Sequence, residues 1–244
     1  HILTVPRPFL EPAMFRDRNY LASLVFIFVV GVIMLASMAL LPPFLQGLMG
    51  YPVLDTGLVL APRGLGTMLA MLVAGRLTGR IDARLLMLAG LLLTAYSLWE
   101  MSLFTTEISR WLVLQNGFIQ GFGMGFVFVP LSTLAYSTLA PHYRNDAAAV
   151  FSLLRNIGSS VGLALCVAYL SRGTQTAHAV LTENVHVFNP AMAQYLNADG
   201  GLASSAGLAM VEAEIQRQSA MLALLADFRA IALAVLLAVP LLFL

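Results

Sequence analysis

Charge is scarce in this sequence, and lysine is absent. Only 10% of the 244 residues are charged, whereas an ordinary soluble domain carries about 25%. Hydrophobic residues make up 59% of the chain, and all 13 basic residues are arginine. Because a soluble fold of this length cannot bury so much apolar surface, we predict that lipid surrounds much of the chain.

Cysteine and histidine are scarce as well. The single cysteine, Cys166, excludes a disulfide framework within the chain. No group of cysteine and histidine residues has the spacing of a metal site, and His142, His178 and His186 fall outside the hydrophobic runs. An intramembrane enzyme needs its nucleophile, base or metal ligands at one depth, so we predict no catalytic residues, no metal and no cofactor.

Long hydrophobic runs are what the sequence has in abundance. A helix that crosses a bilayer needs about 20 mostly apolar residues, and six runs approach or exceed that length. They predict membrane-spanning helices at 21–45, 56–77, 85–104, 111–139, 147–170 and 227–244. The fold class that follows is an all-α integral membrane protein, built as a bundle of six transmembrane helices.

Arginine placement orients these helices. Seven arginines fall in 1–20, at the end of the second run, or in the loops after the second and fourth runs, and only three fall in the opposite loops. Since arginine-rich loops stay in the cytoplasm, we predict a cytoplasmic lead-in at 1–20, five spans within 21–170, a periplasmic loop at 171–226 and a last span at 227–244. No methionine opens the chain and the last span lacks a flanking charge, so we expect both ends to be cuts within a longer protein.

The periplasmic loop contains two helix-prone stretches, 175–198 and 207–226. In the second stretch, apolar residues recur at helical spacing beside Glu212 and Glu214. One interpretation is a helical hairpin that rests on the membrane surface. The other is a docking element for a periplasmic partner.

Charged side chains inside a span are costly, so they indicate a function or a local partner. Arg63 lies inside the second run, next to Pro62 and close to two glycines. It is interpreted either as a cation at the edge of a substrate cavity or as an arginine that snorkels to the headgroups. Glu100, near the end of the third run, is either a proton carrier or a carboxylate solvated at the interface.

Arg155 lies inside the fifth run, about one turn before Gly158. Gly158 and Gly162 form a small-xxx-small face that favours close helix packing, so we expect Arg155 to point into the protein. Two roles are open. One is a structural ion pair with another half of the protein, and the other is a gating or coupling role together with Asn156.

The fourth run carries two stripes, each with a period of four residues. Gly117, Gly121 and Gly125 predict close packing against a neighbouring helix. Amides and a methionine, one position round the helix, suit either a cavity for varied apolar molecules or hydrogen bonding between helices. The residues that we predict to line the substrate cavity are Arg63, Asn116, Gln120, Met124, Phe128, Met34 and Met38.

The loop after the second run has a recognisable pattern. Its sequence, GRLTGRIDAR at 75–84, is similar to the loop signature G-x-x-x-D-R-x-G-R. Gly79 stands where the signature has an acid, and Asp82 stands where it has glycine. The positions of interest are Gly75, Gly79, Arg80, Asp82 and Arg84.

Three further stretches strengthen the resemblance. They are APRG at 61–64, LRNIG at 154–158, and QSAMLA at 218–223 followed by Asp227. Together with the loop, they resemble the major facilitator superfamily, and specifically its 14-span drug:proton antiporters of EmrB type. The resemblance covers nearly the whole chain but only the last six spans of that family.

This resemblance implies half of a major facilitator fold, with an N-terminal half of the same polypeptide and two extra spans elsewhere. The first, second, fourth and fifth spans would face a central cavity, while the third and sixth would lie outside. The carboxylates that carry protons would be in the absent N-terminal half. The binding partners implied are protons, membrane lipid, a hydrophobic small molecule, a periplasmic adaptor (membrane fusion protein) and an outer-membrane channel.

The function implied is proton-coupled efflux of hydrophobic drugs or toxic compounds across the bacterial inner membrane by alternating access. An exporter of lipid, fatty acid or siderophore on the same fold is an alternative that only substrate assays separate. A membrane scaffold subunit without transport is another. Nucleic-acid binding has no support, because the arginines lie at the membrane borders instead of on one basic face.

Overall fold

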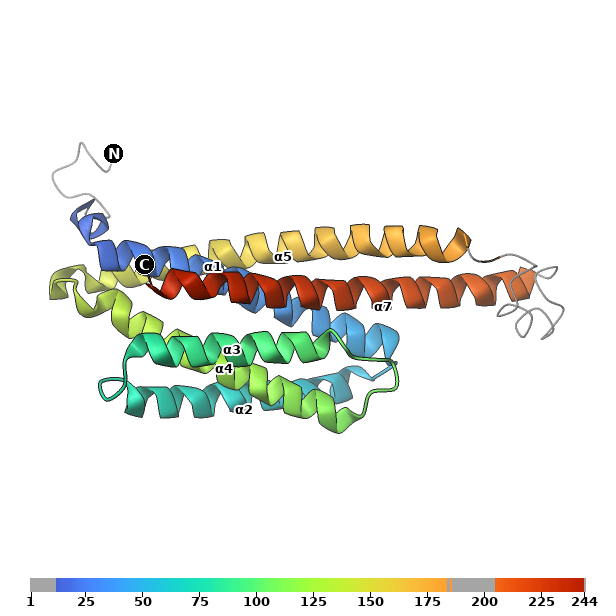
Figure 1. Ribbon diagram of the computed structural model, residues 1–244, viewed down its shortest axis with the longest axis horizontal. Helices are drawn as coiled ribbons and strands as arrows, with labels where there is room; N and C mark the ends of the chain where they lie inside the picture. The colour runs from blue at the N-terminus through green and yellow to red at the C-terminus, as the bar shows by residue number, and fades with distance from the viewer. Residues whose placement is uncertain (1–11, 184, 186–204, 244) are drawn as a thin grey trace.

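The computed structural model describes residues 12–183, 185 and 205–243. Within this part, six helices are long and apolar enough to cross a membrane (Figure 1), which confirms the all-α membrane fold. Their bounds are α1 Arg18–Pro43, α2 Val53–Leu77, α3 Ala83–Met101, α4 Arg110–Ser137, α5 Arg144–Glu183 and α7 Ser205–Ala238. Shorter helical turns lie at Pro12–Arg16, Phe44–Leu48, Pro141–Tyr143 and Val239–Phe243.

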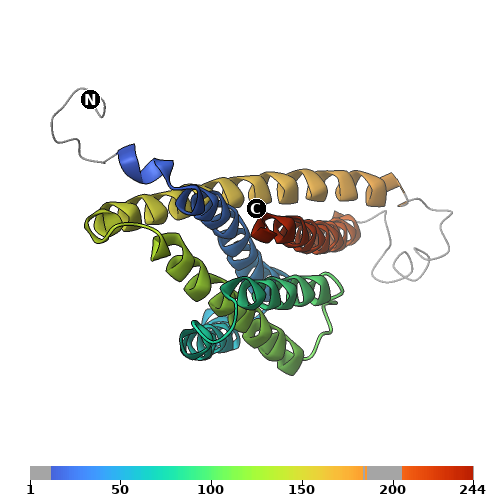
Figure 2. The ribbon, with the colours of Figure 1, turned by 60° about the vertical axis from the view of Figure 1, so that its left-hand side comes forward.

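The helices form two groups with α1 between them. α2, α3 and α4 lie together, while α5 and α7 run side by side (Figures 1 and 2). α1 packs against α5 and also contacts α4 and α7. A second connection runs between α3 and α7. α1 is therefore placed to transmit a displacement from one group to the other.

Glycines let α1 and α5 approach closely, as the sequence pattern predicts. The backbone carbonyl of Phe28 occupies the space where a side chain at Gly158 would stand, and the carbonyl of Val32 does the same at Gly162. From the other side, Gly31 faces the carbonyl of Arg155. Such contacts between backbones are typical of membrane helices that pack through small residues.

α4 meets its two neighbours through separate glycines. Gly121 lies against the carbonyl of Arg63, and Gly125 lies against the next turn of α2. Gly123 instead lies against Gly90 of α3, with the backbones in close contact. The predicted stripe of glycines thus packs on α2, whereas Gly123, which is outside that stripe, brings α3 close.

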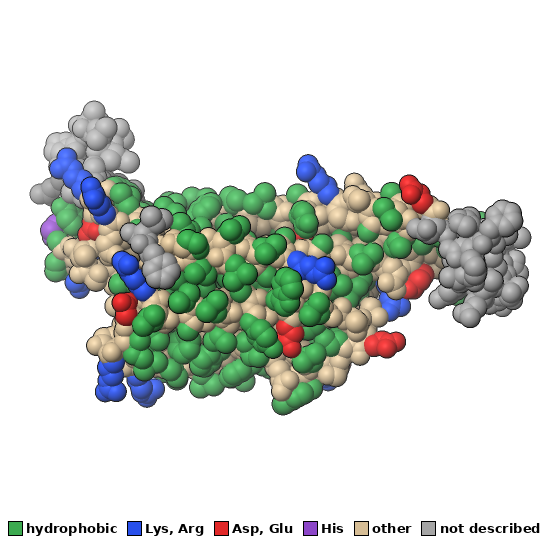
Figure 3. Space-filling view, in the orientation of Figure 1, with side chains coloured by type: hydrophobic (Ala, Val, Ile, Leu, Met, Phe, Trp, Pro, Cys, Tyr) green, Lys and Arg blue, Asp and Glu red, His purple; other side chains and the backbone are tan. Residues whose placement is uncertain are grey.

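Arginine side chains gather at one end of the bundle, where α1 and α3 begin and α2 and α4 end (Figures 1 and 3). We call this the arginine-rich end. It is the end that the distribution of arginine assigns to the cytoplasm, and that assignment stays a prediction.

The predicted loop signature lies at this end. Gly75, Gly79, Arg80, Asp82 and Arg84 are all exposed. Gly79 has a φ of 94°, a left-handed conformation that favours glycine. Asp82 is the N-cap of α3, because its carboxylate accepts a hydrogen bond of 2.9 Å from the backbone N–H of Arg84. Asp82, which stands where the signature has glycine, therefore caps the N-terminus of α3.

The last two helices extend well beyond the predicted spans. Residues 171–183 continue α5, and 205–226 form the first part of α7. Gly173 of α5 lies against Ala223 of α7, so the two extensions run side by side. Of the helix-prone stretch 175–198, the residues after 185 lie outside the described part.

The last helix begins at Ser205, 22 residues before the predicted start of its span. Asp227 and Arg229 interrupt the apolar run in sequence, but they do not interrupt the helix. Asp227 is buried and Arg229 is exposed, so the two charges leave α7 on different faces.

Candidate substrate cavity

A cavity of roughly 520 Å³ lies where α1, α2 and α4 meet. Methionine dominates its wall among the described residues. The lining side chains are Met34, Met38, Leu60, Arg63, Gly64, Thr67, Met68, Met71 and Met124. Because methionine is unbranched and polarizable, a wall of this kind adapts to apolar molecules of different shapes.

Arg63 supplies the one charged side chain in this wall. Its Nη2 donates a hydrogen bond of 3.0 Å to the hydroxyl of Ser37 on α1. Thr67, one turn further on α2, donates to the carbonyl of Arg63 at 2.9 Å and lies 3.0 Å from the carbonyl of Gly121. No carboxylate among the described residues forms an ion pair with Arg63. Its remaining N–H groups are therefore available to an acceptor in the cavity.

The structure brings together four of the seven residues predicted to line the cavity: Met34, Met38, Arg63 and Met124. Phe128 lies elsewhere, with its ring beneath the guanidinium of Arg155. The distance from Arg155 Cζ to the ring centroid is 5.6 Å, which is within the range of a cation–π contact. This contact joins α5 to α4.

Arg155 itself is partly buried and Asn156 is exposed. In the described part of the chain, Arg155 forms no salt bridge. The stacking on Phe128 therefore holds its guanidinium against α4 without an ion pair among the described residues.

The two amides of α4 do not line the methionine cavity. Asn116 is buried and bonds to α3 instead: its Oδ1 accepts from the Ser97 hydroxyl at 2.7 Å, and its Nδ2 donates to Glu100 Oε2 at 2.7 Å. This is hydrogen bonding between helices, which was the alternative interpretation of the stripe. Gln120 is also buried, and neither of its amide atoms has a partner among the described residues.

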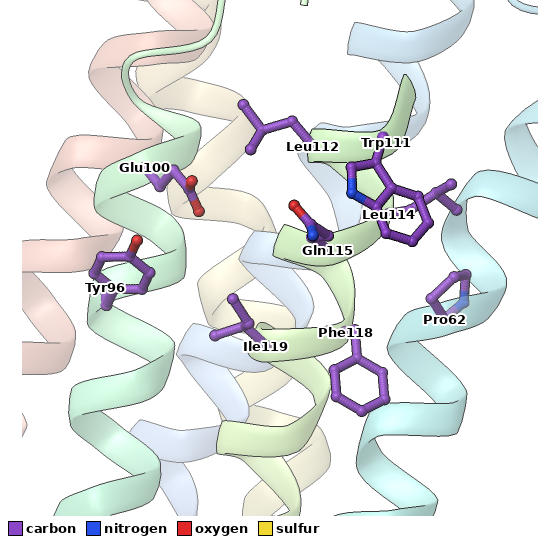
Figure 4. A pocket seen from close by; sticks show the side chains of 9 residues that line it. All are labelled: Pro62, Tyr96, Glu100, Trp111, Leu112, Leu114, Gln115, Phe118 and Ile119. Carbon is purple, nitrogen blue, oxygen red and sulfur yellow. The ribbon is translucent and has the colours of Figure 1, made fainter. Parts of the chain in front are cut away.

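A second pocket, of roughly 620 Å³, lies among α2, α3 and α4 away from the arginine-rich end. Figure 4 shows Glu100 of α3 and Gln115 of α4 on facing walls, with Trp111 before Gln115 on α4 and Phe118 after it. Glu100 is not merely solvated, because Asn116 donates to it. Sequence reasoning did not predict this pocket, since its side chains come from three separate helices.

Among the residues of the methionine cavity and its supports that sequence reasoning missed are Met68, Met71 and Ser37. Met68 and Met71 follow Arg63 and Gly64 at helical spacing, so the periodicity of α2 could have identified them. Ser37 carries no such signal. Its role depends on the distance to Arg63, which only the packing of α1 against α2 determines.

A family model and individual relatives match most of the chain. The model of the Major Facilitator Superfamily matches residues 4–163. The chain is 30% identical over 188 residues to the Probable multidrug resistance protein EmrY of Escherichia coli (strain K12), which covers 77% of this chain and 37% of that protein. It is 28% identical over 200 residues to the Multidrug export protein EmrB of the same organism, covering 81% and 39%. The chain therefore spans less than two fifths of these relatives.

A solved structure with a similar fold is that of a bacterial homolog of the human lysosomal transporter Spinster, in its inward-facing and unoccupied conformation. The TM-score is 0.59 at 19% sequence identity, and the match covers 95% of this chain and 50% of that chain. At this identity the likeness concerns the fold alone. Six helices here correspond to half of that transporter.

Proposed function

Because this chain belongs to the major facilitator superfamily, we propose that the full-length protein exports hydrophobic drugs or toxic compounds by proton-driven alternating access. The chain is a multi-pass protein of the bacterial inner membrane, and its relatives of EmrB type are transporters and not enzymes. In the proposal, the N-terminal half of the same polypeptide supplies the opposite wall of the substrate cavity, and the proton gradient takes the place of a cofactor.

The observation that carries the proposal is the methionine cavity with its single cation. The cavity has room for a drug-sized molecule, since such sites occupy about 300–1,000 Å³. Apolar contacts to Met68, Met71 and Met124 would bind compounds of varied shape, and Arg63 would bind an acceptor group on some of them. A wall with many adaptable contacts and few directional ones suits an exporter of broad specificity.

Arg155 lies where the proposed conformational change would alter its contacts. It lies on α5 beside the close contact with α1, and it stacks on Phe128 of α4. A rearrangement of α5 relative to α4 would break that stacking and release the guanidinium toward another acceptor. We propose that Arg155 acts in gating, together with the neighbouring Asn156.

The extensions of α5 and α7 support a partner outside the membrane. At 1.5 Å per residue, the 40-residue α5 is about 60 Å long, roughly twice the hydrocarbon thickness of about 30 Å. His178 of α5 and Glu212 of α7 lie 2.9 Å apart and join the two extensions. We propose that this paired projection contacts a periplasmic adaptor, which would in turn meet an outer-membrane channel.

The test is transport by the full-length protein in proteoliposomes. A fluorescent hydrophobic dye should accumulate when a pH gradient is imposed and should not accumulate when an ionophore collapses the gradient. Replacing Arg63 by alanine should weaken the accumulation of dyes that carry an acceptor group. Accumulation of a labelled fatty acid but no dye would favour the lipid exporter, and the absence of any gradient-driven flux would favour a scaffold.

A further inference from the structure

Asp227 is a buried carboxylate in the interior of a membrane-spanning helix. The residue is 2% exposed, and it lies within Gly207–Leu242, a helical stretch that is long and apolar enough to cross a membrane. Its Oδ2 has no hydrogen-bond partner in the described part of the chain. An ionisable residue in such a place is costly, and it points to a function.

The distance of Asp227 from the arginine-rich end is less than the hydrocarbon thickness of about 30 Å. At 1.5 Å per residue, about 22 Å of helix separates it from Leu242, and Leu242 lies in a surface pocket with Arg18 and Arg84 at the arginine-rich end. Arg63 lies at a similar depth, about 21 Å of helix from the end of α2 at Leu77. The buried carboxylate and the cation of the cavity thus occupy similar levels of the bundle.

On α5, which packs against α7, Cys166 is a titratable side chain within electrostatic range of Asp227. The thiol of Cys166 donates a hydrogen bond of 3.8 Å to the carbonyl of Ala36 on α1. Ala36 directly precedes Ser37, the acceptor for Arg63. Adjacent residues of α1 therefore contact the surroundings of Asp227 on one side and the cation of the methionine cavity on the other.

Among the described residues, no cation on the helices that pack against α7 forms an ion pair with Asp227. α1 carries no charged or titratable side chain between Leu21 and Pro43. On α3, Tyr96 and Glu100 line the separate pocket of Figure 4, and Arg84 lies at the arginine-rich end.

On α5, Arg155 is turned toward Phe128, and the described residues give neither Arg155 nor Arg172 an ion pair with Asp227. On α7 itself, Arg229 is exposed. A carboxylate that is buried without a cation is neutralised most readily by a proton.

We propose that Asp227 binds and releases a proton during the transport cycle and is a coupling site within this half of the protein. The inference rests on the proposed proton-driven export. In the conformation described here, a proton taken up from the periplasmic side has formed the O–H bond of the carboxylic acid. In the alternate conformation, water or a base reaches Asp227, the O–H bond breaks, and the proton leaves toward the cytoplasm.

Because α1 contacts both sites, its movement can couple Asp227 to the methionine cavity. A substrate that draws Arg63 away from Ser37 breaks the hydrogen bond that joins α1 to α2. The same helix, α1, also accepts a hydrogen bond from Cys166 of α5 at the carbonyl of Ala36. Movement of α1 relative to α5 would then open or close the surroundings of Asp227. If α1 has two positions and both sites favour one of them, substrate binding changes the proton affinity of Asp227, and protonation of Asp227 changes the substrate affinity of the cavity.

The experiment compares the wild-type full-length protein with Asp227→Asn, and with Glu100→Gln as the matched control. Glu100 is a carboxylate in the same bundle that already has a partner in Asn116. In proteoliposomes, Asp227→Asn should lose dye accumulation driven by a pH gradient but keep the exchange of dye down its own gradient. Glu100→Gln should keep both. Asp227→Glu, which restores the carboxylate, should recover gradient-driven accumulation with a displaced pH profile.

A second measurement does not depend on transport. Infrared difference spectra of the purified protein, recorded as the pH is raised, should contain the band of a protonated carboxylic acid that Asp227→Asn lacks and Glu100→Gln retains. Equal bands in the wild type and Asp227→Asn would overturn the inference, and so would full gradient-driven accumulation by Asp227→Asn. A wild-type protein with no gradient-driven accumulation would instead overturn the proposed function.

Discussion

Arg63 of α2 donates a hydrogen bond of 3.0 Å to the hydroxyl of Ser37 on α1. The bond crosses between two helices at the wall of the methionine cavity, and it satisfies part of a guanidinium inside the membrane. It therefore has two consequences: it fixes the direction of the one charged side chain among the described residues of that wall, and it joins α1 to α2.

Ser37→Ala should destabilise the protein, because it leaves a guanidinium N–H without its acceptor. The expected cost is about 1–3 kcal/mol, measured as a lower thermal unfolding temperature of the full-length protein in detergent. The matched control is Ser160→Ala, because the Ser160 hydroxyl is exposed and bonds only the carbonyl of Asn156 in its own helix. Equal unfolding temperatures for the two variants would show that the bond to Arg63 contributes nothing.

Gly158→Ala should separate α1 from α5, because the added Cβ would overlap the carbonyl of Phe28. Overpacking of this kind costs about 1–3 kcal/mol. Gly57→Ala is the control, since nothing lies within 4 Å of its added Cβ, and there alanine should stabilise the helix by roughly 0.5–1 kcal/mol. Thermal unfolding of both variants measures the difference. A stabilised Gly158→Ala protein would contradict the close packing of these two helices.

Arg155→Ala should greatly reduce drug resistance in cells without lowering expression, because the variant loses the side chain that we assign to gating. Phe128→Leu should reproduce part of the loss, since it removes the ring on which Arg155 stacks. In a double-mutant cycle on thermal stability, the two positions should be coupled by about 0.5–2 kcal/mol. Normal resistance in a well-expressed Arg155→Ala strain would remove Arg155 from the mechanism.

Asp17, which lies just before α1, should make stability depend on acid pH. A hydrogen bond from Thr138 and those from the N–H groups of Tyr20 and Asn19 hold the pKa of the Asp17 carboxyl below its ordinary value. Its contribution is therefore present above the unfolded-state pKa and is lost as the pH falls through the lower folded-state pKa.

Thr138→Val should raise the pKa of Asp17 and so shift the acid-induced loss of stability to a higher pH. Unfolding temperatures measured from neutral to acid pH test this, with Asp17→Asn as the reference that lacks the titrating group. Identical pH profiles for the wild type and Asp17→Asn would mean that Asp17 makes no pH-dependent contribution.

The membrane fold could be predicted from the sequence because hydropathy over about 20 residues is a strong local signal. The close packing at Gly158 and Gly121 could be predicted for a similar reason, since spacing along one helix places small residues on one face. The direction of Asn116 could not be predicted. Periodicity predicts that Asn116 lies on one face of α4. Whether that face lines a cavity or packs on another helix depends on the neighbouring helix, and here Ser97 of α3 bonds to Asn116.

Asp227 is the clearest case in which local hydropathy misled. Its charge predicts the border of a span, whereas the structure places it, buried, inside the continuous helix α7, which packs against α1, α3 and α5. Burial by other helices is a tertiary property, so a window along one helix does not contain it. The same holds for the bond between Arg63 and Ser37.

The central claim is that the methionine cavity holds the exported compound, and direct binding tests it. A fluorescent hydrophobic dye should bind the purified full-length protein, and Met68→Ala combined with Met71→Ala should weaken that binding. Each lost methionine would cost roughly 1–2 kcal/mol of apolar contact. Met210→Ala, at an exposed methionine on α7, should bind as the wild type does. Unchanged dye affinity in the Met68/Met71 double variant would contradict the account.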